Sequence, residues 1–282
     1  MPLSGAINQD FGGIIGDVSG PIEWLYNFGI SGAEIFPLLL FIGIGAMIDF
    51  SPLLANPKLI FFGAAAQLGI FLTIIIASVI PGFGLNDAAA VGIIGAADGP
   101  TSILVAQVLN SKYLGPITVA AYSYMALVPI IQPMAIKAVT TKNERKIRMD
   151  YNPKQVSKLA KIIFPIAVTV VAGLIAPASI SLVGFLMFGN LIKECGVTKD
   201  LSESASKVLA NLITLLLGIT ISFSMKAESF VSLQTIYIMG LGLMAFIFDT
   251  IAGVLFAKLI NIFSKRKINP MVGAAGISAF PM

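Results

Sequence analysis

The sequence contains no histidine and only one cysteine, Cys195. Histidine-based acid–base catalysis, a zinc centre and a disulfide framework are therefore excluded from this polypeptide. Charge is also scarce, because 11% of the 282 residues are charged, against about 25% in a soluble domain. We expect Cys195 to be a small apolar filler. Any chemistry must use carboxylates, hydroxyls, amides, lysines or a cofactor that a partner holds.

Hydrophobic residues are abundant instead: they make up 57% of the chain, and the mean hydropathy is +0.93. Apolar runs of about 20 residues are long enough to cross a bilayer as helices. This pattern predicts an all-α polytopic membrane protein. The first 20 residues lack the basic and apolar regions of a signal peptide, so we expect the spans themselves to direct insertion. The expected spans are 35–48, 59–80, 88–109, 114–139, 162–176, 180–192, 208–223 and 233–263.

We divide the chain into four parts: an N-terminal polar or interfacial segment (1–34), a first membrane repeat (35–136), a basic loop (137–161) and a second membrane repeat (162–282). The first repeat contains a helix broken at 92–102, and the second ends inside its own broken segment. Two prolines are expected to deny the connector 49–58 a regular helix.

The basic loop holds eight Lys or Arg residues against two acids, so its net charge is +6 while the whole chain has +4. Loops rich in Lys and Arg stay in the cytoplasm, so we place this loop there. It is either a topology determinant alone or a docking surface for an acidic soluble partner or anionic lipid. A second basic cluster, Lys265–Lys267, should lie on the same side. The number of membrane crossings between the two clusters must then be even. This requires that 162–176 and 180–192 both cross the membrane, or that the two together form a hairpin that does not cross it.

One carboxylate lies in the middle of a membrane-length run, Gly92-Ile-Ile-Gly-Ala-Ala-Asp98-Gly-Pro-Thr-Ser102. An ionised Asp in hydrocarbon costs about 2.5–3.5 kcal/mol, so it normally faces a polar cavity, a cation or a proton. Gly99 and Pro100 should unwind the helix at Asp98. Hard oxygen ligands suit a small hard cation, so we predict a site for Na⁺ or a proton. The oxygens expected there come from Ala96, Ala97, Asp98, Thr101 and Ser102. Close packing of small residues would explain the glycines and alanines, but not the acid.

Other polar residues in the spans are secondary candidates. Tyr124 needs a partner for its hydroxyl and is able to pass a proton, whereas Tyr122 or Tyr113 is expected to be an interfacial anchor. Asp249 is predicted to be a second ion contact, with a helix-end or cavity-lining acid as the alternative. Asn190 is a further candidate contact, and together with Glu194 it is interpreted as a capping or gating group.

A weak internal repeat indicates that the broken segment around Asp98 has a counterpart in the second half of the chain. Residues 37–45 resemble 182–190, and Gly95-Ala-Ala-Asp-Gly-Pro has a counterpart in Gly273-Ala-Ala-Gly-Ile-Ser-Ala-Phe-Pro281. Interrupted segments at matching places in two halves indicate a transporter-type ion site at mid-membrane. We therefore include Ser278, in the second broken segment, among the ion-binding residues.

Five motifs in order resemble the β-subunits of biotin-dependent, sodium-ion-translocating decarboxylases, which act on oxaloacetate, methylmalonyl-CoA or glutaconyl-CoA. The similarity runs in register from about Phe36 to Met282. The motifs lie at 92–102, 121–133, 141–149, 188–196 and 267–282.

The resemblance implies an inverted-repeat, elevator-like helical fold with discontinuous helices. It also implies that the subunit decarboxylates carboxybiotin delivered by a partner and couples CO₂ release and proton uptake to Na⁺ export. Biotin is then not attached to this chain. In the family the Asp of Asp-Gly-Pro-Thr binds Na⁺, which is Asp98 here, and the second Tyr of Tyr-Ser-Tyr, here Tyr124, acts in coupling.

The implied partners are a carboxyltransferase (α) subunit, a biotin carrier domain or subunit, a small membrane γ or δ subunit, lipid and further copies of β, without nucleic acid. The implied location is the cytoplasmic membrane of a bacterium or archaeon. Family members continue past Pro281-Met282 with further membrane helix, so we expect this chain to be a fragment. The alternative function is a secondary Na⁺- or proton-coupled transporter of inverted-repeat type, and a structural membrane anchor is a third reading.

Overall fold

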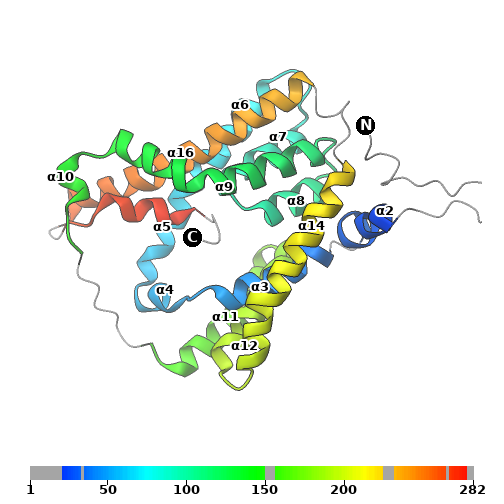
Figure 1. Cartoon of the computed structure of the whole chain (residues 1–282). Helices are drawn as coiled ribbons and strands as arrows, with labels where there is room; N and C mark the ends of the chain where they lie inside the picture. Colours follow the sequence, from blue (N-terminus) through cyan, green and yellow to red (C-terminus); the bar gives the residue numbers. More distant parts are fainter. Residues whose placement is uncertain (1–20, 33–34, 150–155, 225–231, 265–266, 278–282) are drawn as a thin grey trace, which may run out of the picture. The chain divides into compact units, whose positions relative to one another are not determined.

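The computed structural model describes residues 21–32, 35–149, 156–224, 232–264 and 267–277 (Figure 1). All secondary structure in these residues is helical, which confirms the all-α class. Five described stretches are long and apolar enough to cross a membrane, or up to seven if each of two bent helix pairs is one span. The chain is a multi-pass membrane protein with discontinuous helices.

The chain forms two compact units that alternate along the sequence. Unit 1 comprises residues 1–55 and 154–225, and unit 2 comprises 56–153 and 226–282. The basic loop is divided between them, because its residues up to 153 belong to unit 2 and Lys158 and Lys161 belong to unit 1. The predicted repeats follow internal similarity rather than compactness, so that division stays a prediction.

Unit 1 is organised around α3 (Ile35–Met47) and α12 (Ile180–Cys195). The two backbones approach so closely that a Cβ at Gly45 would overlap the Leu186 carbonyl oxygen. Asn190 of α12 donates to the carbonyl oxygens of Gly45 (3.3 Å) and Ile48 (3.0 Å) at the end of α3. The other elements are α2 (Pro21–Tyr26), η1 (Asn27–Gly32), α4 (Ser51–Ala55), α11 (Lys158–Ile175), η4 (Pro177–Ser179), α13 (Lys199–Glu203), η5 (Ser204–Leu209) and α14 (Ala210–Ser224).

Helices α11 and α12 form a hairpin around Pro177. Lys161 Nζ lies 3.8 Å from Glu194 Oε2, so the outer ends of the two helices meet. Each is long and apolar enough to cross a membrane, as are 199–221 and α16. The described residues between the two basic clusters thus contain four stretches of spanning length, an even number, which agrees with the predicted topology.

Unit 2 is built on its longest helix, α16 (Leu233–Phe263). Helix α9 (Leu114–Val139) runs beside it in the same direction, because Tyr124 contacts Met239 and Val139 contacts Lys258 further along both helices (Figure 1). After Phe263 the chain turns back, and Gly273 lies against Gly253. The other elements are η2 (Pro57–Leu59), α5 (Ile60–Ala66), α6 (Leu68–Val79), α7 (Leu85–Gly92), η3 (Ile93–Ala96), α8 (Gly99–Val108), α10 (Lys142–Arg145) and η6 (Pro270–Gly276).

One local expectation was wrong, and two expected spans differ in detail. The connector 49–58 contains the short helices α4 and η2, because proline is tolerated in a first helical turn. The expected span 59–80 is confirmed as the stretch 57–79, which is long and apolar enough to cross a membrane, although a break at Gln67 separates α5 from α6 within it. The expected span 208–223 begins earlier, since the apolar helical stretch starts at Lys199.

The segments paired by the weak repeat fall in the same unit. Residues 37–45 and 182–190 lie on α3 and α12 of unit 1, and the two glycine-rich broken segments both belong to unit 2. Each unit thus combines matching pieces of the two halves, as an intertwined repeat would.

Candidate functional site: two broken segments on α16

The break in the first repeat lies between η3 and α8. Ala97 adopts the left-handed conformation (φ 53°, ψ 37°), and Asp98 is extended (φ −122°, ψ 105°). Left-handed backbone costs a non-glycine residue about 1–2 kcal/mol, so packing must hold Ala97 there. Pro100 has no N–H, which removes the donor that would bond the Ala96 carbonyl four residues back. The predicted interruption at the acid is confirmed.

Asp98 contacts two of the predicted oxygens, the hydroxyls of Thr101 and Ser102. Its Oδ2 accepts a hydrogen bond from Thr101 Oγ1 (2.5 Å), and its carbonyl oxygen accepts one from Ser102 Oγ (2.8 Å). Ser102 is fully buried, while Asp98 is partly buried. One carboxylate with several neutral oxygens is the donor set of a small hard cation.

The second broken segment packs on the same helix, one turn further along. In the first segment, Gly95 lies against Ala245 and Asp249 of α16, and in η6, Gly273 lies against Gly253. Four residues along a helix correspond to about 6 Å. Ala97 and Ile277 also join one apolar cluster with Val128 and Phe246. The structure therefore brings the two broken segments together, and Ser278, which follows Ile277, lies outside the described residues.

Asp249 is buried between η3 and the start of α6. Its Oδ1 accepts a hydrogen bond from the Ile70 N–H (3.1 Å), and its Oδ2 would lie 2.6 Å from a Cβ at Gly95. The interruption at Gln67 creates a new helix N-terminus, whose free N–H groups attract a carboxylate. Asp249 thus accepts a hydrogen bond from a free N–H group at a helix N-terminus, which agrees with the alternative of a helix-end acid. Its role as a second ion contact stays a prediction. The signal that sequence reasoning missed is Gln67-Leu-Gly69 inside an apolar run.

The two tyrosines of α9 face different neighbours. Tyr124 is buried, and its hydroxyl donates a hydrogen bond to the Met239 carbonyl oxygen on α16. Tyr122 packs against Gly99, and its hydroxyl oxygen is buried. The expectation that Tyr122 is an interfacial anchor was wrong, because its polar tip does not face a membrane surface. Tyr113 donates to the Gly82 carbonyl oxygen (3.3 Å) in an exposed turn, as an anchor would.

Asn190 belongs to unit 1 and Asp98 to unit 2. Asn190 uses both amide hydrogens on the end of α3, where Lys193 Nζ also contacts the carbonyl oxygens of Met47 (3.1 Å) and Ile48 (3.0 Å). These contacts favour the capping interpretation, because cationic and amide donors satisfy the free carbonyl groups of a helix C-terminus. A contact of Asn190 with an ion stays a prediction.

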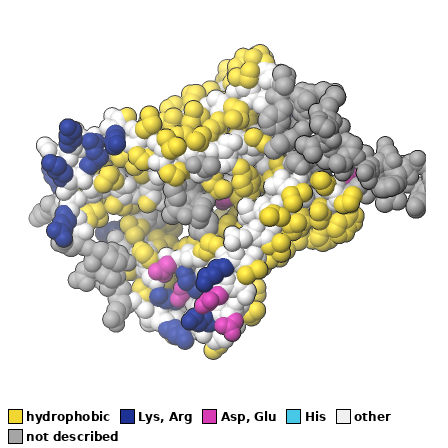
Figure 2. Space-filling model, viewed as in Figure 1, with side chains coloured by type: hydrophobic (Ala, Val, Ile, Leu, Met, Phe, Trp, Pro, Cys, Tyr) yellow, Lys and Arg dark blue, Asp and Glu magenta, His cyan; other side chains and the backbone are white. Residues whose placement is uncertain are grey.

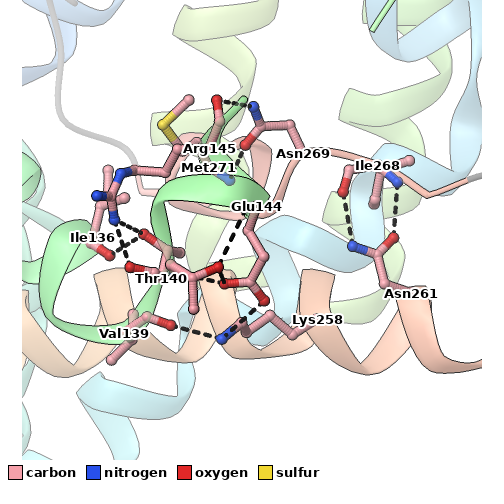
Figure 3. A network of polar contacts seen from close by, with 11 residues as sticks. Ile136, Val139, Thr140, Glu144, Arg145, Lys258, Asn261, Ile268, Asn269 and Met271 are labelled. Atoms are coloured by element: carbon pink, nitrogen blue, oxygen red, sulfur yellow. Dashed lines mark hydrogen bonds and ion pairs between the residues drawn. The ribbon is translucent and has the colours of Figure 1, made fainter. Parts of the chain in front are cut away.

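A network of polar contacts orders the segment after α9 (Figure 3). Glu144 Oε1 lies 3.1 Å from Lys258 Nζ of α16, and Arg145 donates to Thr140 Oγ1 (2.9 Å). Asn269 Nδ2 donates to the carbonyl oxygens of Arg145 and Ile147, each at 3.0 Å. The segment is therefore fastened both to α16 and to the start of η6.

These contacts leave other basic side chains exposed. We call the exposed residues of this end of unit 2 the basic surface: Lys137, Lys142, Lys146, Arg148 and Lys267. Figure 2 shows Lys and Arg side chains gathered at the end that carries α10, without Asp or Glu side chains among them on that face. Lys267, the described residue of the second basic cluster, lies two residues before Asn269, which contacts Arg145 and Ile147. The location of both clusters on the cytoplasmic side stays a prediction.

The pKa of Glu144 gives the first testable prediction. Hydrogen bonding from the Thr141 backbone, followed by the contacts with Lys258, lowers this pKa below its usual 4.5. A carboxyl with a lowered folded pKa stabilises the fold above its unfolded pKa, and this contribution is lost as pH falls through the folded pKa. We expect Glu144→Gln to lower stability by less than about 1 kcal/mol at neutral pH. Thermal unfolding of both proteins from pH 7 downward should show the difference closing below about pH 4.5; a constant difference would contradict it.

Broken membrane helices that bring an acid and neutral oxygens together are typical of ion-translocating proteins. The family model described as "Na+-transporting oxaloacetate decarboxylase beta subunit" matches residues 2–282. The chain belongs to this family.

Individual relatives agree with this assignment. The chain is 52% identical over 248 residues to the methylmalonyl-CoA decarboxylase subunit beta of Propionigenium modestum, covering 88% of this chain and 62% of that protein. It is 49% identical over 269 residues to the probable oxaloacetate decarboxylase beta chain of Vibrio cholerae serotype O1, covering 93% and 61%. It is 50% identical over 249 residues to the glutaconyl-CoA decarboxylase subunit beta of Acidaminococcus fermentans, covering 88% and 66%. The chain thus spans about six tenths of the length of the first two relatives.

Proposed function

We propose that this chain is part of the membrane subunit of a primary sodium pump. A carboxyltransferase (α) subunit loads biotin on a carrier domain, the membrane subunit releases CO₂ from that carboxybiotin, and the release drives Na⁺ export with proton uptake. The observation that carries the proposal is the pairing of the two broken segments on α16, with Asp98 and its neutral oxygens at the first break. Family membership supports Na⁺ as the transported ion.

We propose the following residue roles, which the contacts of Thr101 and Ser102 with Asp98 support. Asp98 balances the charge of Na⁺, and the oxygens of Ala96, Ala97, Thr101, Ser102 and Ser278 complete the site. Tyr124 links the site to α16 through the Met239 carbonyl oxygen, so it is placed to relay a change in α9. We further propose that the subunit works by an elevator-like motion in the cytoplasmic membrane of a bacterium or archaeon. In the complex it would assemble with further copies of β and with a small γ or δ subunit.

We also propose that the basic surface docks the biotin carrier. A pure topology determinant needs positive charge but no fixed structure. Here the one described acid of 137–149 is paired with Lys258, and the Asn269 contacts hold the backbone in place. The segment is poor in exposed apolar side chains, which membrane-surface helices require. An ordered, positively charged surface is instead complementary to an acidic face of a soluble protein.

Charge reversal tests the docking surface. Lys142→Glu combined with Lys146→Glu should raise the KM for the carboxylated carrier about tenfold at low salt, because electrostatic steering is lost. The matched control is Lys199→Glu combined with Lys207→Glu in unit 1, where both lysines are exposed. The difference should shrink as salt increases. Equal effects of the two double variants would contradict docking at this surface.

The proposed function is tested with the assembled complex in proteoliposomes. We expect ²²Na⁺ uptake only while oxaloacetate, methylmalonyl-CoA or glutaconyl-CoA is decarboxylated, with the acyl substrate set by the carboxyltransferase. Avidin, which binds biotin, should stop both processes. Na⁺ movement driven by an ion gradient alone, without decarboxylation, would instead support the secondary transporter.

A further inference from the structure

The ring of Tyr122 lies directly beside the break that carries Asp98. A Cβ at Gly99 would come within 2.5–2.8 Å of three carbon atoms of this ring. Gly99 therefore allows the tyrosine to approach the backbone of the residue that follows the acid. The approach also fixes the position of the ring, since helices α8 and α9 hold both residues.

The Tyr122 hydroxyl oxygen is buried and has no hydrogen-bond partner in the described protein. Leaving a buried hydroxyl unpaired costs about 1–3 kcal/mol, and a bound ion or water is a common explanation for such a group. Asp98 lies near enough to interact electrostatically with this hydroxyl. The oxygen retains two lone pairs when its proton is kept, so it is able to act as a neutral ligand.

The neighbouring hydroxyls are already engaged. Thr101 donates to the Asp98 carboxylate, and Ser102 donates to the Asp98 carbonyl oxygen. Tyr124, which the family resemblance singles out, donates to Met239 on α16. Among these side chains, Tyr122 is the one whose hydroxyl contacts no protein acceptor in the described residues.

We infer that the Tyr122 hydroxyl is a neutral oxygen ligand of the cation held at Asp98, and that it contributes to the choice of Na⁺ over larger cations. This rests on the proposed function, because it assumes that Asp98 binds a cation. A neutral ligand adds coordination without a second negative charge, so one carboxylate still balances one monovalent ion. The rigid contact with Gly99 restricts how far the oxygen can retreat from a larger ion.

The test is Tyr122→Phe in the assembled complex, which keeps the ring and removes the oxygen. The Na⁺ concentration that gives half-maximal decarboxylation should rise about tenfold, which corresponds to about 1.4 kcal/mol, while the rate at saturating Na⁺ changes less than twofold. Tyr113→Phe is the matched control, because its hydroxyl bonds the Gly82 carbonyl oxygen away from the break. The preference for Na⁺ over K⁺ should decrease in Tyr122→Phe and not in Tyr113→Phe.

A binding measurement tests the cation site at Asp98 separately from the assignment of Tyr122 as one of its ligands. Na⁺-dependent thermal stabilisation of the purified complex should be lost in Asp98→Asn and should need higher Na⁺ in Tyr122→Phe. If wild type and Asp98→Asn respond alike to Na⁺, the proposed cation site itself is wrong. If Asp98→Asn loses the response while Tyr122→Phe keeps the wild-type Na⁺ midpoint and selectivity, only the assignment of Tyr122 is overturned.

Discussion

Asp98→Asn should abolish Na⁺-dependent decarboxylation, with a loss of at least about 100-fold, while the complex still assembles. Asn preserves the size of the side chain and its contacts with Thr101, but it removes the negative charge. Removing one partner of a buried ion pair costs about 3–5 kcal/mol, and each 1.4 kcal/mol is about a factor of ten. The measurement is Na⁺-stimulated CO₂ release together with ²²Na⁺ uptake in proteoliposomes.

Asp87→Asn provides the control for Asp98→Asn. Asp87 is a buried acid of the same unit whose carboxylate accepts a hydrogen bond from Ser111 (2.7 Å) near the start of α7. Its replacement should leave Na⁺ stimulation intact, because its contacts are those of a helix end. Persistent Na⁺ stimulation and Na⁺ uptake in Asp98→Asn would show that Asp98 is not the ion ligand.

Gly253→Val should detach η6 from α16 and lower stability by about 3 kcal/mol or more, since inserting a side chain against backbone cannot be relieved by a change of rotamer. A Cβ at Gly253 would overlap the Gly273 carbonyl oxygen. The second broken segment would then leave the first, so Na⁺ transport should fall together with the thermal unfolding temperature. Limited proteolysis of 267–277 reports the detachment directly.

Gly240→Val tests whether this loss is local. Gly240 lies on the same helix, and no described atom lies within 4 Å of a Cβ placed there. Its replacement should change stability by no more than about 0.5 kcal/mol, as surface substitutions usually do. Comparable damage from both variants would point to a general effect on α16 rather than to its contact with η6.

The sequence predicted the features that depend on local chemistry. Gly99 and Pro100 beside Asp98 indicate an interruption, and the chain is interrupted there. The run 233–263 indicates a long helix, and α16 has those bounds. The contacts of Thr101 and Ser102 with Asp98 could be predicted because these residues lie within four positions of it. The resemblance added Na⁺ and Tyr124, which spacing alone does not supply.

Features that depend on distant contacts were missed. The N–H of Ile70 after the interruption at Gln67 is paired by Asp249, 179 residues away in the sequence, so no local pattern predicts this contact. The position of Tyr122 depends on how α9 is rotated toward α8, which the local sequence Ala121-Tyr-Ser-Tyr124 does not reveal. The polar network of Glu144, Lys258 and Asn269 likewise joins segments far apart in the chain.

The alternation of the two units along the chain sets an order of assembly during synthesis. Helix α3 leaves the ribosome long before α12, whose Asn190 contacts Gly45 across 145 residues. At about 5–20 residues per second, this interval is on the order of 7–30 s. During that time α3 has glycines and unpaired carbonyl groups without their partner helix. We therefore expect nascent α3 to depend on the insertion machinery or a chaperone until α12 arrives, and variants that slow translation between them to yield less assembled protein.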